Sequence, residues 1–545
     1  MSEFDYVIIG AGSAGCVLAN RLSADPELRV LLLEAGPRDR HPFIHVPVGL
    51  AKMISNRRYN WAYETEPQTN LDNRRITWPR GKTLGGTSSL NGMIYIRGHA
   101  RDYDLWRQMG LAGWSYADVL PYFKRAEGNE RGANTFHGAD GPLNVTEAHH
   151  DNPLFDAFIE AGSEAGYPVN SDFNGAEQEG FGRYQFTIRN ARRWSTAAAY
   201  LRPALSRPNL TVETEALTQR IVIAKGRAEG VVYRQGRRVI TAYAAREVLL
   251  AAGVVNSPQI LMLSGVGDAD HLGDHGIAPV VDLPEVGRNL QDHSNIHTVH
   301  AATIKTLTDD LTRFERSAFA VARAVLFRSG PAAGFPLEGG AFIRTAPELE
   351  MPDVQFHFSA GNLMSLIRQP FSPPTTDHTR PDAFMCHACV LRPESRGAIT
   401  LRSADPAAAA VIQPNYLSTE RDRATLREAF KAMRYVMTRP ALARLSTGEI
   451  WPGPGEASDG EIDAFVRSAA STVYHPAGSC RMGADERAVV DESLKVRGIE
   501  GLRVVDASVM PTLIGGNTNA PTVMIAEKAS DMILGRAPLP PEHIA

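Results

Sequence analysis

The chain has 545 residues, of which 43% are hydrophobic and 22% charged, and its formal net charge is −4. This length allows two or more domains with large cores, and the slightly acidic balance gives no sign of a nucleic-acid partner, for which a basic stripe is expected. No apolar run reaches the roughly 18 residues of a membrane span, and the acidic N-terminus leads straight into a strand rather than a signal peptide, so we expect a cytoplasmic protein and leave peripheral contact with the inner membrane open.

The chain opens with a predicted β-α-β unit. Residues 4–9 form a short apolar run typical of a buried strand, and residues 13–24 have apolar side chains at helical spacing. A second apolar run at 29–33 predicts another buried strand, parallel to the first. The Pro-rich stretch 37–80 predicts a long irregular loop, and loops of such length usually have a function.

A glycine motif joins the first predicted strand to the helix. Gly10, Gly12 and Gly15 fit the pattern G-x-G-x-x-G. The first permits a tight turn, the second lets backbone approach a pyrophosphate, and the third lets the helix pack on the sheet. The helix N-terminus offers N–H groups to phosphate, and Glu34 ends the second strand, where a carboxylate can accept hydrogen bonds from a ribose. This context predicts dinucleotide binding without separating FAD from NAD.

A second glycine-rich stretch, at 81–92, reads Gly-Lys-Thr-Leu-Gly-Gly-Thr-Ser-Ser-Leu-Asn-Gly. Small residues in such a run let the backbone pass close to a large planar or phosphorylated group. An ordinary glycine loop is the alternative interpretation.

The middle of the chain divides into a strand-rich part and a mixed part. Residues 209–250 predict several strands, followed by a helix at 257–264. From 300 to 455, strands alternate with helices at 312–328 and 419–437. This alternation indicates an α+β layer built on an antiparallel sheet.

The four cysteines do not form a disulfide framework. Cys386 and Cys389 have Cys-x-x-Cys spacing, but they lie in a predicted buried strand. Two thiolates without a second pair make a poor zinc site. We therefore expect core cysteines and no metal site.

Motifs along the whole chain, in the same order, resemble the glucose-methanol-choline (GMC) oxidoreductases, and bacterial FAD-dependent alcohol dehydrogenases and choline dehydrogenase most of all. The motifs are the opening glycine motif, the run at 81–89, and the segments 256–267, 286–293, 474–483 and 505–508. The resemblance implies an α/β, Rossmann-like FAD-binding domain made of discontinuous segments, and an α+β substrate domain with an antiparallel sheet. The expected segments are 1–145, 196–300 and 460–545 for the FAD-binding domain, and 146–195 and 301–459 for the substrate domain.

The resemblance also implies which residues contact FAD. For the ADP half they are Gly10, Gly12, Ser13, Ala14, Gly15, Glu34, Ala35 and Thr218. For the pyrophosphate and the flavin they are Thr83, Gly85, Gly86, Ser89, Asn91, Gly92, Met93, Asp506, Ala507, Asn517, Thr518 and Thr522. Some members link FAD covalently to a histidine after the Ser-Ser of the second motif. This chain has Leu90 at that position, so we expect noncovalent FAD.

His475 matches the catalytic histidine of the family. Pro476 favours extended backbone at His475, and imidazole titrates near neutral pH, which suits proton abstraction. The resemblance gives Asn519 the task of donating a hydrogen bond to the substrate oxygen, with helix capping as its alternative role. Helix 521–535 would direct its N-terminus at the flavin. We expect His475 to remove the hydroxyl proton of a primary alcohol, aliphatic or aromatic, while hydride passes to flavin N5 and an aldehyde forms.

The substrate pocket is the least determined part. Glu338 aligns with a carboxylate that pairs with the choline ammonium in choline oxidases, but Leu337 stands before it in place of the aromatic residues that favour a cation. We expect Glu338 to support the pocket from behind. Trp61, Val473 and Phe358, the last within segment 356–366, are the other candidate substrate contacts.

Three alternative functions stay open at this point. A quinone-type electron acceptor is expected, and O₂ would make the protein an alcohol oxidase instead. Choline dehydrogenase is the alternative reaction. The same fold resembles that of hydroxynitrile lyases, in which FAD has a structural role, and that of flavin photoenzymes, in which FAD acts under light.

Overall fold

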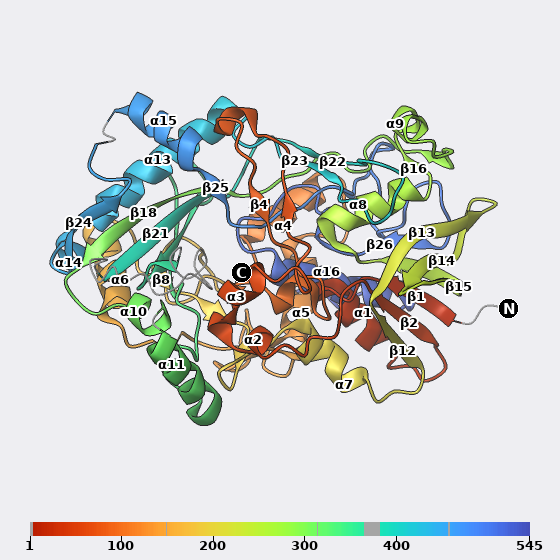
Figure 1. Ribbon diagram of the computed structural model, residues 1–545, viewed down its shortest axis with the longest axis horizontal. Coiled ribbons are helices and arrows are strands. Elements are labelled where there is room, and N and C mark those ends of the chain that lie inside the picture. The colour runs from red at the N-terminus through yellow and green to blue at the C-terminus, as the bar shows by residue number, and fades with distance from the viewer. Residues whose placement is uncertain (1–3, 149, 313, 364–381, 456–457, 545) are drawn as a thin grey trace.

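The computed structural model describes residues 4–148, 150–312, 314–363, 382–455 and 458–544. Two seven-stranded sheets lie toward opposite ends of its long axis, each with helices packed against it (Figure 1). Both sheets are assembled from segments far apart in the chain. Distant sequence motifs therefore meet in the space between the sheets.

The first sheet combines parallel and antiparallel pairs. In order, its strands are β12 (Leu210–Thr214), β2 (Val30–Glu34), β1 (Phe4–Ile9), β15 (Arg238–Leu250), β14 (Arg227–Gln235) and β13 (Ala216–Ala224), with β26 (Leu502–Val504) paired to β15. β1 lies parallel to both β2 and β15. With α1 (Ser13–Leu22) connecting β1 to β2, the predicted β-α-β unit is confirmed.

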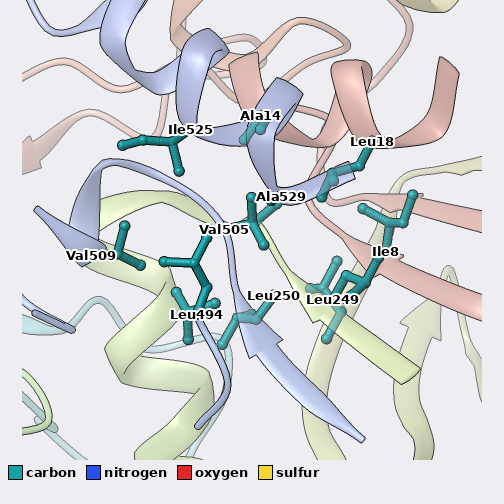
Figure 2. Packing of buried hydrophobic residues seen from close by; sticks show 14 of the residues in the cluster. Ile8, Ala14, Leu18, Leu249, Leu250, Leu494, Val505, Val509, Ile525 and Ala529 are labelled. Carbon is teal, nitrogen blue, oxygen red and sulfur yellow. The ribbon is translucent and has the colours of Figure 1, made fainter. Parts of the chain in front are cut away.

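Two helices bury one face of the first sheet. α1 and α16 (Asn519–Ile533) lie over β1 and β15, and their apolar side chains meet those of the strands (Figure 2). Leu18, Leu249 and Ala529 in this layer are at most 1% exposed, and such burial of apolar surface is the main stabilising contribution to the domain. Because α1 starts where β1 ends, its N-terminus lies at the carboxyl edge of the parallel strands, where open α/β sheets bind ligands.

The second sheet is antiparallel throughout, as predicted for this part of the chain. In order, its strands are β24 (Ser446–Trp451), β18 (Ser294–Ala302), β21 (Ala383–Val390), β20 (Val354–Ser359), β19 (Gly339–Ile343) and β8 (Gly180–Arg183), with β25 (Ser471–Thr472) paired to β18. α13 (Glu420–Met437) and α6 (Pro153–Glu164) pack against it. β18 runs through residue 300, where the sequence placed a domain division, and the domain boundaries stay a prediction.

Two predicted segments differ in detail. The stretch 37–80 is less irregular than expected. It contains α2 (Pro42–His45), α3 (Leu50–Ile54) and a pair of two-residue strands, β3 (Tyr63–Glu64) and β4 (Thr77–Trp78). Hydrophobic periodicity cannot detect elements this short. The predicted helix 521–535 is α16, and it starts earlier because Pro521 falls in its first turn, where a backbone N–H has no partner in the helix.

Two further predictions concern the buried cysteines and membrane-spanning segments. Cys386 and Cys389 are fully buried free thiols on β21, which confirms core cysteines. In the described part of the chain, no helix has both the length and the apolar content needed to cross a bilayer.

Candidate active site

A cavity of about 700 Å³ extends between the two sheets, a volume within the usual range of small-molecule sites. Gly10 and Glu34 line it from the carboxyl edge of the first sheet, together with residues of the second glycine-rich stretch. We call this part the glycine end. His357 and His387 of the second sheet line it together with His475, and we call this part the histidine end.

The two glycine-rich segments contact each other at the glycine end. The Gly85 N–H donates to the Ala11 carbonyl oxygen at 2.7 Å. A Cβ on Gly86 would lie 2.7 Å from the Gly12 Cα, and Gly86 has a φ of +51°. Glycine is therefore required here both by the backbone angle and by the close approach of two backbone segments.

Most residues predicted to contact the cofactor line this one cavity, although they come from five distant segments. The lining residues among them are Gly10, Gly12, Ser13, Ala14, Glu34, Ala35, Gly86, Asn91, Gly92, Met93, Thr218, Asp506, Ala507, Asn517, Thr518 and Thr522. The cavity thus brings together the motifs on which the sequence interpretation depended.

Four of the predicted cofactor residues, Gly15, Thr83, Gly85 and Ser89, lie behind the cavity wall. A Cβ on Gly15 would lie 1.8 Å from the Gly10 carbonyl oxygen, so this glycine lets α1 pack on the turn. The Thr83 and Ser89 hydroxyls donate to backbone carbonyl oxygens, each at 2.7 Å. Their contacts shape the glycine loops and do not face the cavity.

The Glu34 carboxylate is held in place by backbone groups. Its two oxygens accept hydrogen bonds from the Ala11 N–H at 3.0 Å and the Gly36 N–H at 2.8 Å. Burial raises the pKa of Glu34 to about 7, and these two N–H groups oppose the rise. A ribose hydroxyl that donated to this carboxylate would favour its charged form in the same way.

At the histidine end, His475 belongs to a chain of hydrogen-bonding groups. Its Nδ1 lies 3.1 Å from the Nδ1 of His293, and the His293 Nε2 lies 3.1 Å from the Leu391 carbonyl oxygen. On the other side, the Asn517 Nδ2 lies 3.0 Å from the His475 Nε2. The Asn517 Oδ1 accepts from the Gln355 Nε2 at 3.1 Å.

These hydrogen bonds fix the position of the proton on each imidazole. A carbonyl oxygen can only accept, so His293 carries its proton on Nε2 and its Nδ1 is an acceptor. His475 must therefore carry its proton on Nδ1, which leaves the Nε2 lone pair directed at Asn517 and the cavity. An imidazole in this tautomer can accept a proton at Nε2.

Asp292 holds the two histidines together. Its Oδ1 accepts from the backbone N–H of His293 at 2.9 Å and of His475 at 2.8 Å. Its Oδ2 accepts from the Thr472 hydroxyl at 2.6 Å and from the Tyr416 hydroxyl. The buried carboxylate therefore positions the backbone on both sides of the imidazole pair.

Burial keeps both imidazoles neutral. It lowers the pKa of His293 to about 3, and it lowers the pKa of His475 well below its usual value, with added repulsion from His293, His357 and Arg80. His475 is therefore unprotonated throughout the neutral pH range, as a base must be before it reacts.

Asn517 and Asn519 both line the cavity, and Asn517 is the one that contacts His475. Asn519 is the first residue of α16, its N-cap is Thr518, and its Oδ1 accepts from the Ser13 hydroxyl at 2.7 Å. The helix-capping alternative therefore belongs to Thr518, and the amide N–H₂ is the polar group that Asn519 can offer to the cavity it lines. Asn517, which the resemblance assigns to the cofactor, also contacts the His475 Nε2.

The four predicted substrate contacts divide into two pairs. Trp61 and Val473 line the cavity, and the Trp61 ring stacks on Tyr63 with centroids 5.7 Å apart. Glu338 and Phe358 lie away from it. The Glu338 carboxylate binds the His150 Nδ1 at 2.5 Å and lies 3.6 Å from Arg183.

Phe358 is a core residue because its ring stacks on Phe158, with centroids 4.4 Å apart, and meets Phe155 edge-on. Of the segment around it, residues 364–366 lie outside the described residues.

Comparisons with known proteins show which family the chain belongs to. Two family models match the chain, over residues 4–295 and 393–526, and both are described as GMC oxidoreductase. The chain belongs to the GMC oxidoreductase family.

Similar GMC proteins are known from sequence and from structure. The chain is 48% identical to mitochondrial choline dehydrogenase of Homo sapiens, over 98% of this chain and 91% of that one. It is 46% identical to an alcohol dehydrogenase (acceptor) of Pseudomonas putida, over 97% and 96%. Pyridoxine 4-oxidase from Mesorbium loti matches with a TM-score of 0.88 and 32% identity, over 98% of this chain and 100% of that one. A formate oxidase variant of Aspergillus oryzae RIB40 matches with a TM-score of 0.90 and 28% identity, over 98% of both chains.

GMC oxidoreductases bind FAD, and the glycine end of this cavity fits that cofactor. The Thr218 hydroxyl lines the cavity and is buried without a hydrogen-bond partner among the described residues, as expected of a group that a ligand satisfies. The first turns of α1 and α16 both line the cavity and contain no acidic residue, so their N-terminal N–H groups can face negative charge. Leu90 also lines the cavity, and its side chain cannot form a covalent link to the flavin.

The sequence interpretation missed several site residues of this GMC protein. Asp292 and His293 stand in a quoted family motif, but nothing in that motif indicates contact with a histidine 182 residues away. His297, His357 and His387 lie on three different strands, and only the pairing register of those strands shows that they share a face.

Proposed function

We propose that this GMC oxidoreductase oxidises a primary alcohol to the aldehyde, with His475 as the base. The observation that carries the proposal is the His475 tautomer: Nδ1 donates to His293, and the Nε2 lone pair is directed at the Asn517 amide and the cavity. A buried neutral imidazole in this orientation suits removal of a hydroxyl proton, and general-base catalysis typically contributes about 10²–10⁴ in rate.

The side chains divide the chemistry between them. An alcohol hydroxyl would replace the Asn517 amide as the donor to the His475 Nε2 and pass its proton there, while the Asn519 amide N–H stabilises the charge that develops on the oxygen. His293 keeps the Nδ1 proton in place as His475 becomes an imidazolium. Bound FAD would supply a two-electron acceptor for the hydride from the carbinol carbon, and a quinone-type acceptor would be needed to reoxidise it.

The histidine end suits a neutral alcohol. Its apolar lining residues include Phe335, Leu337, Leu363 and Val473. Among the described residues, the carboxylates that line the cavity are Glu34 and Asp506. Both are at the glycine end, where Asp506 accepts from the Ser257 hydroxyl at 2.6 Å.

Choline is the second candidate substrate. It is favoured by the relation to choline dehydrogenase and by Tyr474 in the cavity, because aromatic faces attract quaternary ammonium groups. The Trp61 ring already has the Lys82 Nζ 4.5 Å from its centroid. The Glu338 carboxylate, however, is paired with His150 and Arg183 behind the wall.

The substrate experiment uses a matched pair of alcohols. Choline and its neutral isostere 3,3-dimethylbutan-1-ol have the same shape and differ in charge. We expect kcat/KM with a dye acceptor to favour the neutral isostere and straight-chain primary alcohols. A preference for choline of tenfold or more would establish the second candidate instead.

The acceptor is tested with the same alcohols. We expect turnover with a soluble quinone and little H₂O₂ when O₂ alone is present. Comparable turnover in air would make the protein an oxidase. Absence of flavin reduction by any alcohol would favour a non-redox lyase or a photoenzyme.

Peripheral membrane contact is proposed at α11 (Phe314–Phe327). Phe319, Leu326 and Phe327 on this helix are at least 70% exposed, although a solvent-facing side of a helix is normally polar. Arg316 and Arg323, seven residues apart on the same helix, supply charge complementary to anionic headgroups. The helix projects from the body beside the second sheet (Figure 1).

Vesicle sedimentation tests this contact. We expect the FAD-loaded protein to bind phosphatidylglycerol-containing vesicles, and F319S/L326S to bind at least tenfold more weakly. Val239→Ser is the matched control, since Val239 is an exposed apolar residue (62%) on β15. Equal binding of F319S/L326S and the wild type would contradict the contact.

A further inference from the structure

Three histidines form a row across the second sheet. His297 on β18 lies opposite His387 on β21, and His387 lies opposite His357 on β20. Directly opposite residues of antiparallel strands point to the same face, and all three histidines line the cavity. The rings of His297 and His387 have their centroids 5.1 Å apart. We call this set the histidine row.

Two members of the histidine row, His357 and His387, are neutral imidazoles. Burial lowers the pKa of His357 to about 4 and lowers the pKa of His387 well below its usual value, where His297 and His357 add repulsion. A neutral imidazole has one N–H donor and one acceptor nitrogen. His357 and His387 therefore offer hydrogen bonds without charge.

Polar atoms beside the row have unfilled hydrogen-bonding capacity. The Asn295 Nδ2 donates to the His387 Nδ1 at 2.8 Å, but the Asn295 Oδ1 is buried without a partner among the described residues. The same holds for the His357 Nδ1 in the described part of the chain. Asn295 is 3% exposed and His357 4% exposed, and both line the cavity.

Such atoms point to a ligand. A buried polar group left unpaired costs about 1–3 kcal/mol, so native structures normally satisfy it. The described residues contain no group of three His, Cys, Asp or Glu side chains arranged to hold a metal ion. Hydrogen bonding to a neutral polar group is the chemistry that the row provides.

We propose that the histidine row is a subsite for a second hydroxyl group on the substrate, so that the preferred alcohols are diols or other hydroxy-alcohols rather than plain alkanols. A hydroxyl can donate to the Asn295 Oδ1 or to an imidazole nitrogen and accept from an imidazole N–H. This proposal rests on the proposed alcohol oxidation, since it places one hydroxyl at His475 and another at the row. The apolar residues Phe335 and Leu337 would contact the carbon chain between them.

The experiment compares α,ω-diols with 1-alkanols of equal chain length. We expect the wild type to have a kcat/KM at least tenfold higher for the diol, because a site built to bond a hydroxyl rejects the analogue that lacks it. His357→Leu should lower the ratio of kcat/KM for the diol to kcat/KM for the alkanol by about 10–100-fold, whatever rate the alkanol keeps. His357→Asn, which retains a polar group, should recover part of the loss.

His300→Leu is the matched control. His300 is also a buried histidine of β18, and burial also lowers its pKa to about 4, but it does not line the cavity. We expect the ratio of its kcat/KM for the diol to its kcat/KM for the alkanol to equal that of the wild type. Equal wild-type rates for the two classes, a parallel loss of both in His357→Leu, or a changed ratio in His300→Leu would each overturn the subsite.

A binding measurement separates this proposal from the proposed reaction. Calorimetry on the FAD-loaded His475→Ala protein measures the affinity for 1,6-hexanediol and 1-hexanol without turnover. We expect at least tenfold tighter binding of the diol, lost in the His357→Leu double variant. Selective diol binding by a protein that oxidises no alcohol would contradict the reaction alone, whereas alcohol oxidation without selective diol binding would contradict the subsite alone.

Discussion

The two ends of the cavity are built in different ways. The glycine end is formed by backbone: the Gly85 N–H on the Ala11 oxygen, the close approach of Gly86 to Gly12, and two N–H groups on Glu34. The histidine end is formed by side chains from strands and loops far apart in the chain. Cofactor binding thus depends on contiguous motifs, whereas the reaction and its specificity depend on the packing of the second sheet.

The largest effect is expected from Gly86→Val. Its Cβ would meet the Gly12 Cα at 2.7 Å, and valine is strained at a φ of +51°. We expect a cost above about 4 kcal/mol and a protein that does not retain FAD. Flavin absorbance after gel filtration measures this.

Gly236→Ala is the matched control for Gly86→Val. Gly236 also has a positive φ, +60°, but a Cβ there meets nothing within 4 Å. We expect this variant to keep its FAD. FAD retention by Gly86→Val equal to that of Gly236→Ala would show that the two loops need not touch.

His293→Leu tests the proton arrangement at the other end. Without the His293 Nδ1 acceptor, His475 is free to adopt the wrong tautomer, and we expect kcat to fall by about 10²–10³ with little change in KM. His293→Asn, whose Oδ1 can accept the same proton, should recover part of the rate. Stopped-flow flavin reduction measures both variants. Equal rates of flavin reduction in His293→Leu and His293→Asn would contradict a role for His293 in the mechanism.

The unfolding free energy at acid pH should depend differently on the two ends of the cavity, and this effect is smaller than those above. The pKa of His357 is about 4 in the folded protein and near 6.5 unfolded, so its contribution is present above pH 6.5 and is lost as the pH falls. Between pH 8 and pH 5 we expect His357→Leu to lose roughly 2 kcal/mol less unfolding free energy than the wild type. Glu34 acts in the opposite direction, because its raised pKa of about 7 stabilises the fold as pH falls. Denaturant titration at both pH values measures the difference, and identical losses in the two proteins would contradict it.

Flavin release should show no covalent attachment. Because Leu90 stands where a linking histidine would be, we expect acid precipitation to leave all yellow colour in the supernatant and the protein mass unchanged. A yellow pellet, or a protein mass increased by that of FAD, would contradict noncovalent binding.

The sequence predicted the β-α-β unit at the glycine end because the determinants of that unit are local. β1, α1 and β2 follow one another, so Gly10, Gly12 and Glu34 are ordered by the chain itself. The histidine end depends on long-range register, since the histidine row comes from β18, β21 and β20. The orientation of the Glu338 side chain could not be predicted from the sequence either, because it depends on contact with His150, 188 residues away in the chain.

The most direct test of the account is anaerobic mixing of the FAD-loaded protein with a primary alcohol, for the wild type and for His475→Ala. We expect the wild type to lose its flavin absorbance, and His475→Ala to keep its bound FAD but react at least about 10³-fold more slowly. Reduction of His475→Ala at the wild-type rate would contradict the assignment of the base, and a wild type that no alcohol reduces would contradict alcohol oxidation itself.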